Sequence, residues 1–345
     1  MIHLDNNKLE ISFPEIHENA GVIIDFQRTL RVPDDDTNHF LPPGLGRFPL
    51  RHIEDYDLKN NNHLKERGGV IMPMFQSDAV WLSFTPFDSP YILTYPIAIK
   101  IGTGKICAVS GDEWTSNLNR NPQDYVVTPE QEWIDGYNVD KLGSVRQFIA
   151  APLGQGYTVE EQMRGSSSVG GIQIQAYPLK REKYELLLKA EEYKHGRLVE
   201  EHICASYEPS MEAAAPLDMG LAPGGLINQK IYDDPYSFDD WDLRSTDRCF
   251  VTLANANQWM SITGEEPPIS PLSAKEYSEH GLPWFNYFDG DREAIDGAKK
   301  LGKVKSVKEL SEEKKGNDWF EQDESVDTQV VKKIVSTGFQ KSKKR

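Results

Sequence analysis

The densest group of metal-ligating side chains lies at residues 233–242, which read DDPYSFDDWD. Hard cations such as Ca²⁺ take about six to eight oxygen ligands, and carboxylates supply them well. The spacing is not that of an EF-hand loop, and a solvated acidic turn pinned by its aromatic residues is the favoured alternative. The segment therefore predicts either that turn or a divalent-cation site, with the candidate ligands Asp233, Asp234, Asp239, Asp240 and Asp242.

A second group could bind an anion. Residues 145–162 are typical of a strand, a glycine-containing loop and a helix N-terminus, where free backbone N–H groups attract negative charge. The candidate ligand-binding residues are Arg146, Gly154 and Gly156. Glu160 and Glu161 would repel a phosphate from the first turn of that helix, so a structural turn is favoured.

Two arginines follow loops that could position them. Arg164 precedes a Gly/Ser-rich connection, which could serve as a lid or an oxyanion-type loop but does not match the G-x-S-x-G elbow. Arg47 follows a stiff Pro/Gly turn and, with Arg51 and His52, could line a pocket. A surface loop with an Arg–carboxylate pair is the favoured alternative for Arg47.

An aromatic run, PWFNYF, surrounds Trp284 at residues 283–288. Such a run could form a stacking platform for a sugar, base or peptide. Core packing is favoured, because aromatic residues this close in sequence cannot all face water.

Composition narrows the functional class. The 345 residues carry a net charge of −16, and residues 303–345 carry +3, so residues 1–302 carry −19. A body this acidic repels phosphate backbones, which argues against a nucleic-acid partner. No apolar run is long enough for a membrane helix, and the start lacks the features of a signal peptide.

Cysteine usage predicts the compartment. Cys107, Cys204 and Cys249 are few, widely spaced and without CxxC pairs. This pattern excludes a disulfide framework and favours a reducing, cytoplasmic location. The eight histidines are scattered singly and no zinc-ligand spacing occurs, so no zinc site is expected.

Periodicity predicts the fold class. Residues 21–32 alternate with period two, and further short β-branched or aromatic runs are bounded by turn residues. The connections are too short and too Pro-rich for crossover helices. We therefore expect an α+β, β-rich fold with an antiparallel sheet or sandwich core and a few short helices. The expected strands after the first are 70–75, 79–84, 145–150, 171–177, 250–254 and 259–263, with a hairpin at 95–111 whose favoured turn pairs Ile101 with Ile106.

Capping boxes begin helices after Thr158, Ser273 and Ser306, and residues 181–194 favour a further helix, with a strand at 184–188 as the alternative. Residues 208–225 lack any period and are expected to form a long loop. We predict a globular body at 1–302, divided if at all into two subdomains near 208–225. The charged extension at 303–345 is expected to be partly helical or disordered.

These observations leave function open. The first hypothesis is a soluble cytoplasmic binding or interaction protein, since no catalytic motif is recognisable. The second is a metal-dependent or carboxylate-based hydrolase or lyase using the Asp233–Asp242 loop. The third is a structural subunit of a larger assembly, with the extension docking to a protein partner. No organic cofactor is predicted, and whether the chain is an enzyme stays undecided.

Overall fold

The computed structural model describes most of the chain and is strand-rich, as the sequence predicts. The described residues are 1–56, 62–90, 93–139, 143–166, 169–194, 219–268, 273–288, 292–314 and 330–335. Within them, strands pair into one sheet of 17 and a second sheet of two. Most pairings are antiparallel, which confirms the predicted fold class.

The large sheet contains two runs of strands that meet at one pairing, Met219 with Leu253. The first run, in spatial order, is β1 (Ile2–Asp5), β2 (Lys8–Ser12), β3 (Gly21–Thr29), β8 (Ala79–Pro86), β14 (Ser144–Pro152) and β16 (Met219–Asn228). The second is β7 (Val70–Pro73), β17 (Asp247–Ala254), β15 (Ile172–Pro178), β9 (Ile97–Thr103) and β11 (Val126–Thr128).

Short strands join the margins of these runs. They are β4 (Asn38–His39), β5 (Gly44–Arg47), β6 (Arg51–His52), β10 (Ile106–Cys107), β12 (Trp133–Ile134) and β13 (Gly136–Asn138). The second sheet pairs β18 (Trp284–Phe288) in parallel with β19 (Val331–Val335).

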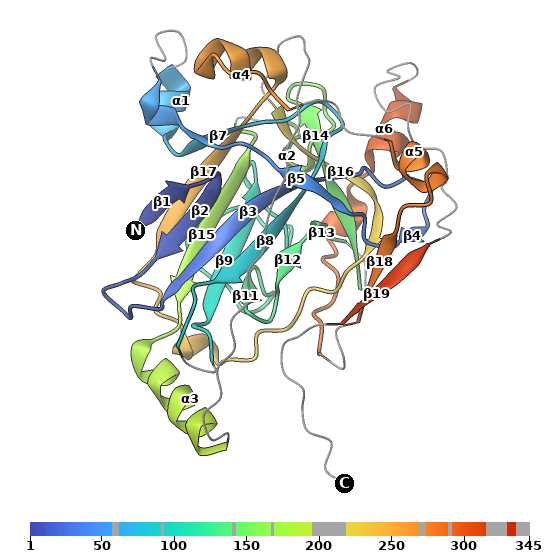
Figure 1. Ribbon diagram of the computed structural model, residues 1–345. Coiled ribbons are helices and arrows are strands. Elements are labelled where there is room, and N and C mark those ends of the chain that lie inside the picture. Colours follow the sequence, from blue (N-terminus) through green and yellow to red (C-terminus); the bar gives the residue numbers. More distant parts are fainter. Residues whose placement is uncertain are drawn as a thin grey trace.

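The helices lie at the edges of this body (Figure 1): α1 and α4 at the top, α3 at the lower left, and α5 and α6 at the right. Their bounds are α1 (Asn62–Arg67), α2 (Val159–Arg164), α3 (Arg181–Lys194), α4 (Ala256–Thr263), α5 (Ala274–Glu279) and α6 (Val307–Glu313). Three 3₁₀ turns complete the elements: Ile53–Asp55, Phe238–Asp240 and Leu301–Lys303. The predicted capping boxes are present at Thr158, Ser273 and Ser306.

Alternating side chains from both runs form one hydrophobic core. Ile24 and Phe26 of β3 and Ile99 and Ile174 of the second run are fully buried in the same cluster. The extension joins the body through α6, where Val307 packs with residues of β14 and β16. Residues 315–329 and 336–345 of the extension lie outside the described part of the chain.

Three local predictions are wrong. Residues 259–263 are helical rather than extended, because Asn255 caps α4 by accepting the backbone N–H groups of Asn257 and Gln258. The hairpin turns one residue later than predicted, so that Ile106 pairs with Thr103 instead of Ile101. Gly104 occupies that turn at φ +57°, a conformation that other residues adopt at a cost.

The predicted loop 208–225 is also wrong where the structure describes it, because residues 219–225 belong to β16. Glycine lets neighbouring segments approach this strand closely. A Cβ at Gly225 would lie 2.2 Å from the carbonyl oxygen of Pro33, and one at Gly224 would lie 2.5 Å from the Ile149 side chain. The composition that looked like a loop therefore permits close packing. Residues 208–218 lie outside the described residues.

Four buried glutamines connect segments that no ladder joins. The Gln147 amide accepts the N–H of Val32 (2.9 Å) and donates to the carbonyl of Leu30 (2.8 Å). Gln123, Gln131 and Gln229 repeat this arrangement: each accepts the N–H of one residue and donates to the carbonyl two residues before it. We call these contacts the glutamine bridges. Each one replaces a rung of a β-ladder with a side chain.

Loss of the Gln147 bridge is expected to destabilise the fold. Gln147→Leu leaves the Val32 N–H and the Leu30 carbonyl without their partner in a site with no solvent exposure. We expect the free energy of unfolding in urea to fall by about 2–4 kcal/mol, since each orphaned buried group costs roughly 1–3 kcal/mol. The matched control is Gln76→Leu at an exposed position, which should stay within about 0.5 kcal/mol of wild type. Equal stability of the two variants would contradict a bridging role.

Candidate functional site

The acidic segment 233–242 forms a hydrogen-bonded turn. Asp234 is buried, and its carboxylate accepts from the Tyr125 hydroxyl (2.6 Å) and the Trp241 indole N–H (2.9 Å) and contacts Arg120 at 2.8 Å. Asp233 pairs with Arg120 at 3.0 Å. These contacts anchor the turn to the body.

The other end of the segment is bonded separately. Asp240 pairs with Lys183 at 2.8 Å and Asp242 accepts from Arg244 and Ser245, while Asp239 is exposed. Across the described ranges, no three His, Cys, Asp or Glu side chains are placed to hold a metal ion.

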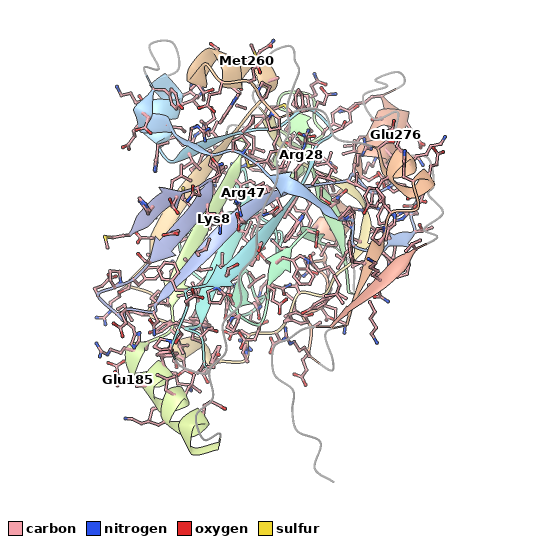
Figure 2. The ribbon with its side chains drawn as sticks, viewed as in Figure 1. Lys8, Arg28, Arg47, Glu185, Met260 and Glu276 are labelled. Carbon is pink, nitrogen blue, oxygen red and sulfur yellow. The ribbon has the colours of Figure 1, made fainter. Side chains whose placement is uncertain are left out.

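The arginines singled out from the sequence contact carboxylates. Arg47 pairs with Asp25 of β3, and Figure 2 shows Arg47 over the strands of the large sheet. Arg146 lies 3.2 Å from Asp34 and also donates to the Gly224 carbonyl, and Arg164 lies 2.5 Å from Glu113. The structure therefore places the three arginines at three separate ion pairs.

The glycine loop before α2 is bonded to its own helix. The Gly154 N–H donates to the Glu161 carboxylate at 2.6 Å, so the internal acid occupies the position expected for an external anion. A Cβ at Gly156 would meet the ammonium of Lys314, 3.3 Å away. Trp284 is fully buried in the hydrophobic core, where its indole N–H donates to Ser278.

A different place has the features of a binding site. A cavity of about 450 Å³ opens between β7, β15 and β17, close to β1 and the end of α1. Four basic side chains line it: His52, Arg67, Lys105 and Arg248. Glu54 is its one acidic lining residue. We call this cavity the basic pocket, and its size is within the usual range for small-molecule sites.

The sheet register fixes where the cations of the basic pocket lie. Arg248 is on β17, and Lys105 lies in the turn between β9 and β10. β15 lies between these two strands and contributes Gln173 to the lining. Neighbouring strands in a sheet are roughly 4.8 Å apart, so the two strands that flank β15 are about 10 Å apart, and both lead to the lining of the basic pocket.

Of the permanent cations in the basic pocket, Arg67 is held by neighbouring groups of the protein, whereas Lys105 and Arg248 can contact a ligand. Arg67 donates to the Val169 carbonyl (3.0 Å) and stacks its guanidinium 4.8 Å from the centre of the Phe250 ring. Within the described part of the chain, neither Lys105 nor Arg248 has a carboxylate partner. Charged side chains of this kind form strong hydrogen bonds to carboxylate and phosphate oxygens. The basic pocket therefore offers a local excess of positive charge in an acidic protein.

Cys249 also lines the basic pocket, but its thiol is a poor nucleophile. Burial raises the pKa of the Cys249 thiol to about 12. Only a thiolate acts as an effective nucleophile, so thiol-based covalent catalysis does not fit this cavity at neutral pH. The arrangement is suited to binding.

Two carboxylates on the segment 129–136 titrate near neutrality. Burial raises the pKa of Asp135 to about 7, against hydrogen bonds from the Trp133 indole (2.6 Å) and the Gln229 amide (2.9 Å). Burial also raises the pKa of Glu130 to about 7. The folded protein therefore holds protons here that an unfolded chain would release.

Comparisons of the chain with protein-family models, with curated proteins and with solved structures find no match. The described helices include none that is long and apolar enough to cross a membrane.

Sequence reasoning singled out only His52 among the basic lining residues. Arg67, Lys105 and Arg248 are spread over 182 positions, and each sits in an ordinary polar context. The pairing of β17 with β7 and with β15, and of β15 with β9, brings them to one cavity.

Both described cysteines should resist alkylation in the folded state. Burial raises the pKa of Cys107 as well as that of Cys249, and at about pH 8 only about one Cys249 thiol in ten thousand is ionised. Peptide mass spectrometry after iodoacetamide treatment should find both unmodified in native protein. Both should be fully modified in denaturant, which serves as the control. Rapid labelling of Cys249 in native protein would contradict the burial argument.

Asp135 should make stability fall as the pH rises. Its pKa is about 7 in the folded state against an ordinary value of 3.8, so its contribution is fully present below pH ~4 and is lost as pH rises through 7. Between about pH 5 and 8, wild type should lose about 2 kcal/mol more unfolding free energy than Asp135→Asn, at about 1.4 kcal/mol per pKa unit. The matched control is Asp239→Asn at an exposed aspartate, which should follow wild type. Parallel profiles for wild type and Asp135→Asn would refute the assignment.

Proposed function

We propose that the protein binds a small organic anion, carrying phosphate or carboxylate groups, in the basic pocket. The observation that supports this proposal most directly is the charge of the lining. Three permanent cations and one carboxylate line a cavity in a chain of net charge −16. Lys105 and Arg248 have no carboxylate partner among the described residues, and such cations attract oxyanions strongly where the surrounding surface is partly closed to water.

The geometry favours a ligand with more than one anionic group. Lys105 and Arg248 enter from opposite sides of β15, while Arg67 is held by Val169 and Phe250. A di- or polyanionic molecule can contact the flanking cations at once, whereas a lone monovalent ion meets only part of the set. The class therefore includes organic phosphates and polycarboxylates of small-molecule size.

Binding is the proposed activity, with no chemical step. This is the first of the functions predicted from the sequence, with a small molecule now named as the ligand class. A reducing, cytoplasmic compartment stays part of the proposal, because Cys107 and Cys249 are buried free thiols. A protein partner for the extension also stays a proposal, and the exposed Val331 and Ile334 of β19 support it.

The test is a titration at low salt. Isothermal calorimetry with inorganic pyrophosphate, citrate and AMP as probes should show saturable binding of at least one, weakening as salt screens the charges. The double variant Lys105→Gln with Arg248→Gln should weaken that binding by at least about tenfold, since charge-assisted hydrogen bonds are worth roughly 1.5–3 kcal/mol each.

The control removes the same charge elsewhere. Lys299→Gln with Arg244→Gln changes two exposed cations outside the basic pocket, and it should bind like wild type. Equal weakening in both double variants would show an effect of net charge alone and would refute the site. So would the absence of saturable binding by all three probes.

A further inference from the structure

A second, smaller cavity lies at the end of β16 nearest β12, and its chemistry differs from that of the basic pocket. It has a volume of about 220 Å³, and three aromatic side chains line it: Trp133, Tyr232 and Tyr287. We call it the aromatic pocket. We propose that the aromatic pocket binds a single uncharged sugar ring.

The aromatic walls meet at a right angle. The rings of Trp133 and Tyr287 are 4.5 Å apart between centroids, with an interplanar angle of 84°. Such a corner presents apolar surface on two sides of a small ligand. The C–H face of a sugar ring is apolar and its edge carries hydroxyls, so it can lie against one wall and leave its edge free for hydrogen bonds.

The floor is rigid because its polar groups are already bonded. Gln131 and Gln229 line the aromatic pocket. The side-chain amide of each forms a glutamine bridge to backbone groups. The Trp133 indole N–H donates to Asp135 at 2.6 Å, which fixes the plane of that wall. A pocket held in this way loses little conformational entropy when a ligand enters.

The rim carries polar groups without net charge. Glu132 and Lys230 contribute one carboxylate and one ammonium. Asn228 is exposed, and in the described structure its side-chain amide has no hydrogen-bond partner. A charged ligand would lose its hydration without a net opposite charge to replace it, whereas a ligand hydroxyl can form hydrogen bonds with the Asn228 amide. This balance favours a neutral polyhydroxylated ligand over the anions proposed for the basic pocket.

The test uses defined sugars as probes. Tryptophan fluorescence and calorimetry should be followed at millimolar concentrations of methyl β-D-glucopyranoside, methyl β-D-galactopyranoside and N-acetylglucosamine. At least one should bind saturably and with little dependence on salt. Tyr287→Leu should weaken that binding at least about fivefold, because it removes one aromatic wall, and Tyr287→Phe should retain it.

Two controls separate this proposal from other effects. Phe285→Leu changes an aromatic on the same strand, β18, outside the aromatic pocket, and should bind sugar like wild type. The double variant at Lys105 and Arg248 should also keep sugar binding, so failure of the anion proposal leaves this one standing. Saturable binding by none of the three sugars, or binding that survives Tyr287→Leu undiminished, would overturn the proposal. Circular dichroism of each variant confirms that a loss of binding is not a loss of folding.

Discussion

Where a buried segment of this protein lies outside the strands, glutamine side-chain amides form hydrogen bonds with its backbone. The segment 230–234 belongs to no strand, yet its alternate N–H and carbonyl groups are bonded by Gln131 and Gln123. Glutamine suits this role because one side chain carries a donor and an acceptor side by side, as a peptide group does. A carboxylate of the same length could not donate to the carbonyl. Without these bridges, burial of the segment would leave several backbone groups unpaired, and each would cost free energy.

The same constraint accounts for the unusual electrostatics of the neighbouring segment. Gln229 bonds both the backbone N–H and the side chain of Asp135, which draws that carboxylate to 3% exposure. Among the described residues no cation pairs with Asp135, and burial of the carboxylate favours its protonated form, which explains a pKa of about 7. Two other buried carboxylates have a cation beside them, and burial raises their pKa as well. Asp124 has Lys100 at 2.6 Å, and Asp78 has Arg28 at 2.6 Å. Figure 2 marks Arg28 within the body.

The sequence predicts elements whose signals are local. The alternation of Val22, Ile24 and Phe26 indicates β3, and the capping box at Thr158 places the start of α2, because both patterns act within a few residues. The glutamine bridges leave no such signal, since a buried glutamine looks like any surface glutamine until its partners are known. The prediction of a loop at residues 219–225 is wrong for a related reason. Glycine is common in loops, but it is also common in strands that a neighbouring segment approaches closely. The candidate sites depend on the same long-range information. The arginines that stand out in sequence each meet a carboxylate, whereas Lys105 and Arg248 become neighbours of one cavity only through β15.

If the basic pocket binds an anion, as proposed, the acidity of the body limits which anions fit it. At physiological ionic strength, charges farther apart than about 8 Å are largely screened from one another, so a ligand that fits inside the pocket is influenced mainly by Arg67, Lys105 and Arg248. A polymeric anion would extend past those cations onto a surface with a net charge of −19 over residues 1–302. Its outer phosphates would gain no cation and would be repelled. A local excess of positive charge within a negative protein therefore selects by ligand size as well as by charge. Repulsion by the acidic surface therefore acts on a polymer more than on a ligand that fits inside the pocket. A small anionic ligand is for this reason compatible with the same acidic composition that argues against a nucleic-acid partner.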